Sequence, residues 1–165
     1  MSTLKVDTIQ NVAGVEQARL VQMKTLTHST LSTTTATWPM DTSIPLIGEG
    51  AALTSLAITP TNTNNTLIIN WTTPAVVNTS SGRDSFVLFD NSDAAVQFSW
   101  SEQPSASYSS YGGFQHIVAG SLGTSELTWK IRFGTSTGTL QMGFLSGLTW
   151  GDIGHSTFTI MEIRA

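Results

Sequence analysis

The sequence predicts an all-β fold, and three observations support this. Ser and Thr together fill more than a quarter of the 165 positions, whereas charged residues make up only 11%. Thr packs well on a pleated surface, and both hydroxyl residues compete with the helical backbone for hydrogen bonds. Apolar segments also recur about every 8 to 14 residues, a spacing typical of a sandwich or barrel.

The sequence predicts a short strand at residues 2–12 that stands apart from the rest of the chain. Leu4 and Val6 alternate with polar neighbours, and an Ala-Gly pair follows at positions 13–14. A strand of this length cannot bury an apolar face alone, so we expect it to dock on another surface; a frayed terminus is the alternative. The chain therefore divides into residues 1–17, a docking strand and linker, and residues 18–165, the head domain.

The head domain contains eight or nine expected strands. A turn leads into a first strand near residue 18, which continues into a Thr-rich segment. The later strands are expected at residues 52–59, 66–71, 84–89, 94–100, 113–119, 126–133, 139–145 and 156–164. Residues 90–93 have the composition of a hairpin turn, Pro74 marks a strand end, and residues 103–111 form a Ser- and Tyr-rich loop.

The last expected strand is apolar on both faces. Phe158 and Ile160 fall on one side, and Met161 and Ile163 fall on the other. A strand that is apolar on both faces is covered on both, which indicates a central position or a subunit interface. Glu162 shares a face with Phe158 and Ile160, and it therefore needs a hydrogen-bonding partner if it is covered.

Charge and composition exclude several classes of function. The net charge is −4 and the seven basic residues are scattered, so the chain has no footprint for nucleic acid. There is no Cys for a disulfide, a thiol nucleophile or a Cys-type zinc site. No apolar run is long enough to span a membrane, and the amino end lacks a signal-peptide pattern. We expect a soluble chain without membrane insertion.

No catalytic or metal-binding motif is present. His28, His116 and His155 have no zinc-site spacing, and no nucleophile elbow accompanies the Asp152 and His155 pair. The acidic turn at residues 90–93 lacks the Gly and Glu of a calcium-binding loop. We therefore expect no enzyme activity, no cofactor and no bound metal.

An aromatic cluster is the best candidate for a contact surface. Trp100, Tyr108, Tyr111 and Phe114 lie in or beside the Ser-rich loop. Tyr and Ser together give a rigid, amphipathic surface at low entropic cost, as in antibody-type binding loops. The cluster either contacts a host receptor or glycan, or covers an edge of the sandwich.

Four segments carry a resemblance to a known family. They are STLKVDTIQN at residues 2–11, LVQMKTLTHSTLSTTT at residues 20–35, LTSLAITPTNTNNTLIINW at residues 53–71 and STFTIMEIRA at residues 156–165. In these segments the chain resembles bacteriophage virion proteins of the fibre-head kind. Residues 72–155 match that family only as a series of strands, and the chain departs from long fibres in having almost no shaft.

The resemblance implies a fold, an assembly and a location. It implies an antiparallel jelly-roll β-sandwich that forms a homotrimer on the outer surface of a phage particle, with the terminal strand near the shared core. The trimer interface would then include Phe158, Ile160, Met161 and Ile163. The opening strand would join the particle through Leu4, Val6 and Ile9, with other virion proteins as partners.

The expected function is therefore a phage virion structural protein, a short tail or head fibre or a knob that attaches to the particle and contacts a host-surface receptor. A capsid decoration trimer that stabilises the shell is an alternative within the family. A glycan-binding module or a depolymerase is the alternative from another class.

Overall fold

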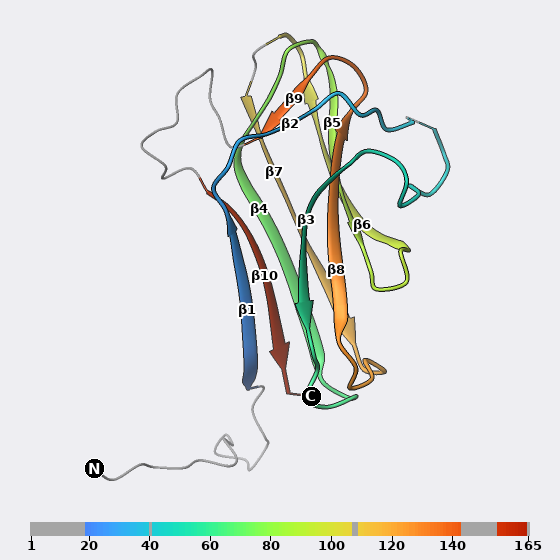
Figure 1. The fold of residues 1–165 in the computed structure, drawn as a ribbon, viewed down its shortest axis with the longest axis vertical. Helices are drawn as coiled ribbons and strands as arrows, with labels where there is room; N and C mark the ends of the chain where they lie inside the picture. Colours follow the sequence, from blue (N-terminus) through green and yellow to red (C-terminus); the bar gives the residue numbers. More distant parts are fainter. Residues whose placement is uncertain (1–18, 40, 107–108, 143–154, 165) are drawn as a thin grey trace, which may run out of the picture.

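The computed structural model describes residues 19–39, 41–106, 109–142 and 155–164, and the regular elements in these residues are all β-strands. The strands are β1 (Leu20–His28), β2 (Ser32–Thr34), β3 (Ala51–Ile58), β4 (Thr66–Asn78), β5 (Gly82–Phe89), β6 (Ala95–Gln103), β7 (Ser109–Ala119), β8 (Leu127–Thr135), β9 (Leu140–Met142) and β10 (Ser156–Ile163). They form a sandwich of two antiparallel sheets (Figure 1). No helix in the described residues is long and apolar enough to cross a membrane.

The strand order within the sheets is that of a jelly roll. The six-stranded sheet places the long strands in the order β1, β10, β4, β7, and the short strands β2 and β9 continue the β10 side of β4. The four-stranded sheet has the order β3, β8, β5, β6. Apart from the β5–β6 hairpin, each long strand is followed by a long strand of the opposite sheet, as in a jelly roll. The predicted all-β, jelly-roll-like sandwich is confirmed.

The core between the sheets is centred on four aromatic rings. Trp71 of β4 lies 6.4 Å from Phe86 of β5 and 6.3 Å from Phe158 of β10, measured between ring centroids. Phe86 also stacks on Phe133 of β8 at 6.4 Å. All four side chains are buried, and they come from both sheets. Because each aromatic side chain buries a large apolar area, this cluster ties the two sheets together.

Three strand boundaries differ clearly from the sequence prediction. Strand β4 continues past Pro74, which lies at a register irregularity between Thr73 and Val76 opposite β7. Proline cannot donate to a sheet ladder, and an irregular position is where a strand tolerates it. The expected loop at residues 103–111 is shorter than predicted, because β6 extends to Gln103 and β7 begins at Ser109.

Both open sides of the sandwich are bridged by side-chain hydrogen bonds. On the β6–β7 side, Gln103 Nε2 donates to Ser110 Oγ at 2.7 Å, and the hydroxyls of Ser101 and Ser110 lie 2.9 Å apart. On the β1–β3 side, Gln22 Nε2 donates to the Thr59 carbonyl at 2.7 Å. These contacts hold together sheet edges that share no backbone ladder.

The carboxylate of Glu162 joins three parts of the chain at one end of the sandwich. It is fully buried, and it accepts hydrogen bonds from Asn65 Nδ2 at 2.6 Å, from Thr61 N and Oγ1 at 2.8 Å each, and from Gln22 Nε2. The partner expected for Glu162 is therefore present. Burial alone would raise the pKa of Glu162, but the hydrogen bonds from Asn65, Gln22 and Thr61 outweigh it, so the pKa is lowered.

We predict that Glu162→Gln destabilises the fold by about 2 kcal/mol at pH 7, because an amide replaces the charged acceptor of four hydrogen bonds. Because the pKa of Glu162 is lowered in the folded state, the carboxylate contributes stability that is fully present above its ordinary pKa of 4.5 and is lost as pH falls through the folded pKa. The loss in the variant should therefore shrink on acidification. Denaturant titrations from pH 7 to pH 3 measure this; a deficit that does not change with pH would contradict it.

Asp84 is a second buried carboxyl, at the opposite end of the core. Asn78 Nδ2 donates to its Oδ1 at 2.6 Å, whereas Asp84 Oδ2 and Gln103 Oε1 are both buried without a partner. Burial raises the pKa of Asp84 and outweighs the hydrogen bond from Asn78, which lowers it. Gln103 is diagonally opposite Asp84 across the β5–β6 pair, and a protonated Oδ2 would supply a donor next to the unpartnered Gln103 Oε1.

We predict that Asp84→Asn stabilises the protein at pH 7. Because the pKa of Asp84 is raised in the folded state, the neutral acid contributes stability that is fully present below its ordinary pKa of 3.8 and is lost as pH rises through the folded pKa. The amide stays neutral and donates without titrating. The stability gained by Asp84→Asn at pH 7 should therefore vanish at low pH, whereas Glu162→Gln should lose stability at pH 7 and regain it at low pH. Thermal unfolding from pH 3 to pH 8 measures it; a variant less stable than the parent at pH 8 would show that Asp84 is needed as an anion.

Candidate binding groove and sheet face

The outer face of the four-stranded sheet carries an exposed aromatic pair. Phe98 and Trp100 of β6 are 59% and 52% exposed. Their cross-strand partners on β5 are Val87 and Ser85, whose side chains lie on the same face. Two large aromatic side chains left half in water beside each other form an apolar surface that a ligand can cover.

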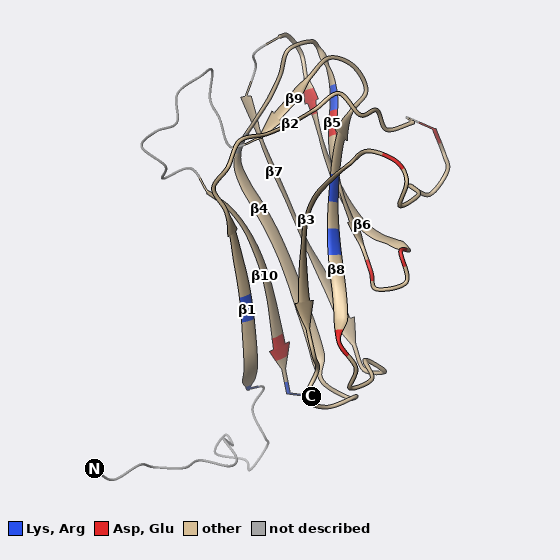
Figure 2. Cartoon of the chain, in the orientation of Figure 1, with Lys and Arg blue, Asp and Glu red and all other residues tan. Residues whose placement is uncertain are grey.

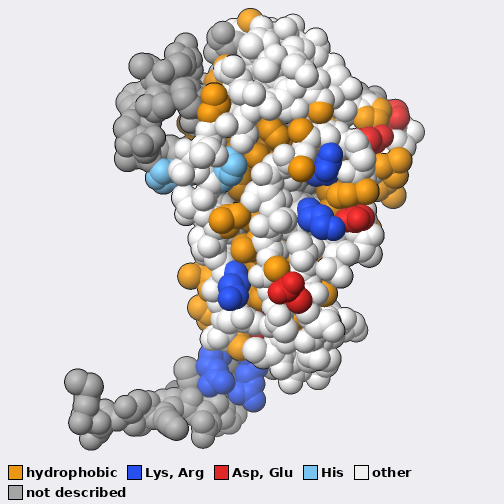
Figure 3. All heavy atoms as spheres, in the orientation of Figure 1, with side chains coloured by type: hydrophobic (Ala, Val, Ile, Leu, Met, Phe, Trp, Pro, Cys, Tyr) orange, Lys and Arg blue, Asp and Glu red, His pale blue; other side chains and the backbone are white. Residues whose placement is uncertain are grey.

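The connection between β2 and β3 lies over part of this face, and we name residues 35–39 and 41–50 the covering loop. Trp38 anchors it, forming a second small core with Val87 and Phe89. The Trp38 amide donates to the Thr135 carbonyl at 3.3 Å. Figure 3 shows hydrophobic side chains gathered on this projecting loop, and Ile44 is 73% exposed there.

Trp38 can lie on the sheet because β8 has glycine beneath it. A Cβ at Gly134 would come within 2.7 Å of Trp38 Cδ1 and Nε1 and within 2.8 Å of the Ala36 carbonyl. Real side chains do not approach that closely, so any larger residue displaces the indole. The absence of a Cβ at Gly134 therefore allows Trp38 and the covering loop to pack close to the sheet.

We predict that Gly134→Ala loosens the covering loop and lowers the free energy of unfolding by about 1–3 kcal/mol, the usual effect of overpacking. Limited proteolysis should then cut the loop faster than in the parent. Gly48→Ala is the matched control, since nothing lies within 4 Å of its added Cβ. Equal cleavage rates in the two variants would contradict this role of Gly134.

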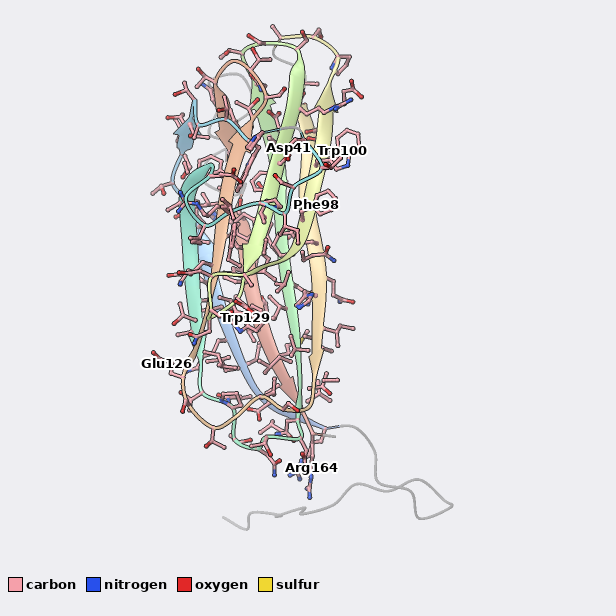
Figure 4. The ribbon with its side chains drawn as sticks, turned by 90° about the vertical axis from the view of Figure 1, so that its right-hand side faces the viewer. Asp41, Phe98, Trp100, Glu126, Trp129 and Arg164 are labelled. Carbon is pink, nitrogen blue, oxygen red and sulfur yellow. The ribbon has the colours of Figure 1, made fainter. Side chains whose placement is uncertain are left out.

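Between the covering loop and β5–β6 lies a groove of about 380 Å³, which we name the aromatic groove. Its lining consists of Trp38, Pro39, Asp41, Ser43, Pro45, Arg83, Ser85, Val87, Phe98 and Trp100. In Figure 4, Asp41 on the loop lies on the same side of the sandwich as Phe98 and Trp100. The volume is within the range of about 300–1,000 Å³ typical of small-ligand pockets, and the lining combines apolar rings with a few polar groups.

Two charged side chains of opposite sign line the aromatic groove. The Ser43 hydroxyl and backbone amide donate to Asp41 Oδ1 and hold the pKa of Asp41 below its usual value. The Arg83 guanidinium lies 5.5 Å from the centroid of the Trp100 ring, a cation–π contact. Among the described residues the one ion pair joins Lys130 to Asp93, so Arg83 has no carboxylate partner there.

The structure does not bring the predicted contact residues together. Trp100 lines the aromatic groove, but Tyr111 is 81% exposed on β7 of the other sheet, and Phe114 packs against the core. Tyr108 lies outside the described residues. The interpretation of these residues as one loop surface is therefore wrong for Phe114, because strand alternation turns its ring inward.

Sequence reasoning missed most of the groove. Trp38, Asp41 and Arg83 were not proposed as contact residues, because they come from separate segments that only the folded sandwich brings together. The Trp38-Pro39 pair in a Pro- and Gly-containing stretch was the available signal. The histidines gave none: His116 lies 6.0 Å from Trp129 between ring centroids, a packing contact.

The outer face of the six-stranded sheet has a different character. Following the pairing register, its outward residues are Leu20, Met23, Thr25 and Thr27 on β1; Thr157, Thr159, Met161 and Ile163 on β10; Thr66, Ile68, Asn70 and Thr72 on β4; and Gly113, Gln115, Ile117 and Ala119 on β7. None of them is charged, and Figure 2 shows β4 and β7 free of charge along their length. We name this surface the uncharged face.

An apolar row crosses the uncharged face from edge to edge. Met23, Met161, Ile68 and Ile117 are directly opposite one another on the four strands. The two end members, Met23 and Ile117, are each 56% exposed. A hydroxyl and amide row follows, in which Gln115 Nε2 donates to an Asn70 oxygen at 2.9 Å. Loss of charge together with exposed apolar side chains is typical of protein–protein contact surfaces.

The four residues predicted for a trimer interface lie on two different surfaces. Phe158 and Ile160 are 0% exposed and belong to the core of the single chain, so their burial requires no second copy. Met161 and Ile163 lie on the uncharged face and are partly exposed. An interface role stays a prediction for these two only. Leu4, Val6 and Ile9, predicted to dock on the particle, lie outside the described residues.

No family model and no curated protein match this chain. Three solved structures resemble its sandwich distantly. The EclA C-terminal domain, a sugar-binding protein, has 10% identity and a TM-score of 0.34 over 82% of this chain and 86% of its own. The bacteriophage CBA120 tailspike protein 4 enzymatically active domain has 12% identity and a TM-score of 0.29 over 74% of this chain. A chain of infectious bursal disease virus, Gx strain, has 13% identity and a TM-score of 0.40 over all of this chain.

This chain spans 18% of the tailspike chain and 41% of the infectious bursal disease virus chain. These likenesses concern the β-sandwich fold, which recurs in sugar-binding, phage tailspike and viral proteins.

Proposed function

We propose that this chain is a phage virion structural protein without enzymatic activity, a short fibre or knob. It forms a homotrimer on the outer surface of the particle, attaches to other virion proteins and contacts the host surface. The uncharged face is the observation that carries the proposal, because the outward residues of four adjacent strands include no charged side chain and leave apolar side chains half exposed. The sequence resemblance to fibre-head proteins supports the same assembly.

The shape of the uncharged face suits a cyclic trimer. In a threefold ring each contact is heterologous. One end of the contact surface on each copy therefore meets the other end of the same surface on the next copy. The apolar row supplies two such ends, Met23 on the β1 edge and Ile117 on the β7 edge. Burying exposed Met and Ile side chains stabilises an assembly at about 25 cal/mol per Å² of apolar area.

The groove favours a host-contacting fibre or knob over a decoration protein. The aromatic groove is on the four-stranded sheet, and the uncharged face is on the six-stranded sheet. Assembly through the uncharged face would therefore leave the groove open to solvent. A protein that only stabilises a shell has no need of an exposed aromatic groove.

We predict that the parent protein has a solution mass of about 53 kDa, three times the 17.6 kDa of the chain. Met23→Glu and Ile117→Glu should each give monomers, because either one places an unpaired charge in every threefold contact. Both sites are half exposed, so the single chain should still fold. Ser55→Glu, on the exposed outer side of β3, is the control and should remain trimeric.

Analytical ultracentrifugation at micromolar concentration measures the masses, and circular dichroism checks the fold. A monomeric parent protein would overturn the proposed assembly. A trimer that both Glu variants retain would show that the copies meet through another surface.

A further inference from the structure

We propose that the aromatic groove binds a neutral pyranose sugar of a host-surface glycan, a proposal that rests on the host-contacting function above and names its ligand. The groove contains both an apolar platform and hydrogen-bonding groups of opposite kinds. The class of ligand follows from the way these groups are combined.

The platform consists of Phe98 and Trp100. Each exposes more than half of its surface, although both rings stand beside the buried Val87. A pyranose ring has one face of C–H groups and a periphery of hydroxyls, so it can cover an aromatic ring and keep its polar atoms free. Covering flat aromatic surface in this way removes apolar area from water at little entropic cost.

The polar side chains of the aromatic groove are more complementary to sugar hydroxyls than to a charged group on a ligand. Ionised Asp41 can only accept hydrogen bonds, and Arg83 can only donate them. Within the described residues, both hydrogen bonds of Asp41 go to Oδ1, so Oδ2 is available to a ligand. A sugar hydroxyl both donates and accepts, and neighbouring hydroxyls on one ring can therefore satisfy both residues.

The charge of the lining selects against ions. One acid and one base face the same groove, so an anionic ligand would meet Asp41 and a cationic ligand would meet Arg83. Each mismatch leaves a repulsive contact or a poorly solvated charge. The groove is thus complementary to a neutral, hydroxyl-rich molecule.

The site is partly organised before a ligand binds. The stacking of Arg83 on Trp100 limits the motion of both side chains, and the turn at Asp41 is closed by Ser43. Groups already held in place lose less entropy on binding. The hydroxyls of Ser43 and Ser85 can rotate to donate or accept as the sugar requires.

The test uses the intact chain and ligand-observed NMR. Neutral gluco-, galacto- and manno-configured oligosaccharides are added at up to about 10 mM, a concentration that reveals binding with a millimolar dissociation constant. A sialylated oligosaccharide, a uronic acid oligosaccharide and a proline-rich peptide are tested alongside. We expect binding by at least one neutral oligosaccharide. Trp100→Ala and Asp41→Asn should each weaken it about tenfold, through loss of the platform and of the charged acceptor.

Tyr111→Ala is the matched control, since it removes an even more exposed aromatic ring outside the groove and should bind as the parent does. Asp41→Asn keeps an oxygen for the Ser43 turn, so it tests the ligand contact without relying on Trp100. Binding of none of the neutral sugars, binding of the acidic sugars or the peptide alone, or undiminished binding by both groove variants would overturn the proposal.

Solution mass is measured on the same samples. A trimer that binds no neutral sugar overturns this inference and leaves the proposed assembly standing. A monomer that binds neutral sugar through Trp100 and Asp41 supports the groove and overturns the trimer.

Discussion

The alternation of side chains along β10 determines which of its apolar residues are buried within a single chain and which remain at the surface. Phe158, Ile160 and Glu162 point inward, where the first two complete the core and the third accepts four hydrogen bonds. Met161 and Ile163 point outward and find no cover within the described chain. A shift of one residue in register would exchange these two sets and place a hydrogen-bonded carboxylate in solvent. Glu162 therefore fixes the register at which the outer apolar row lines up.

The two buried carboxyls show how one sandwich uses the same group in two ways. Glu162 has enough donors to remain ionised although it is buried, whereas Asp84 has one buried oxygen without a hydrogen-bond partner. The first arrangement stabilises an anion and the second stabilises a neutral acid. Both lie inside the sandwich, so neither perturbed carboxyl is available as a surface catalytic group.

The sequence predicted which side chains of the last strand share a face, because a period of two is visible in Phe158, Ile160 and Glu162. It also predicted that Glu162 would need a partner. Periodicity does not show what covers each face, so it could not distinguish a core position for Phe158 from an interface position. The groove was beyond prediction for a related reason: Trp38 reaches the sheet only because Gly134, distant in the sequence, has no side chain.

Placing assembly and binding on opposite sheets has a physical advantage if both proposals hold. An open groove that covers one sugar ring binds weakly, since few contacts must offset the loss of ligand freedom. Three grooves held in one trimer raise the effective concentration of each site for a repeating glycan, and the overall affinity can rise about a hundredfold or more without a new contact. The uncharged face that joins the copies would then matter for binding as much as the aromatic rings do. On this reasoning Met23→Glu should leave the affinity of one groove for one sugar unchanged and weaken attachment to a glycan-coated surface.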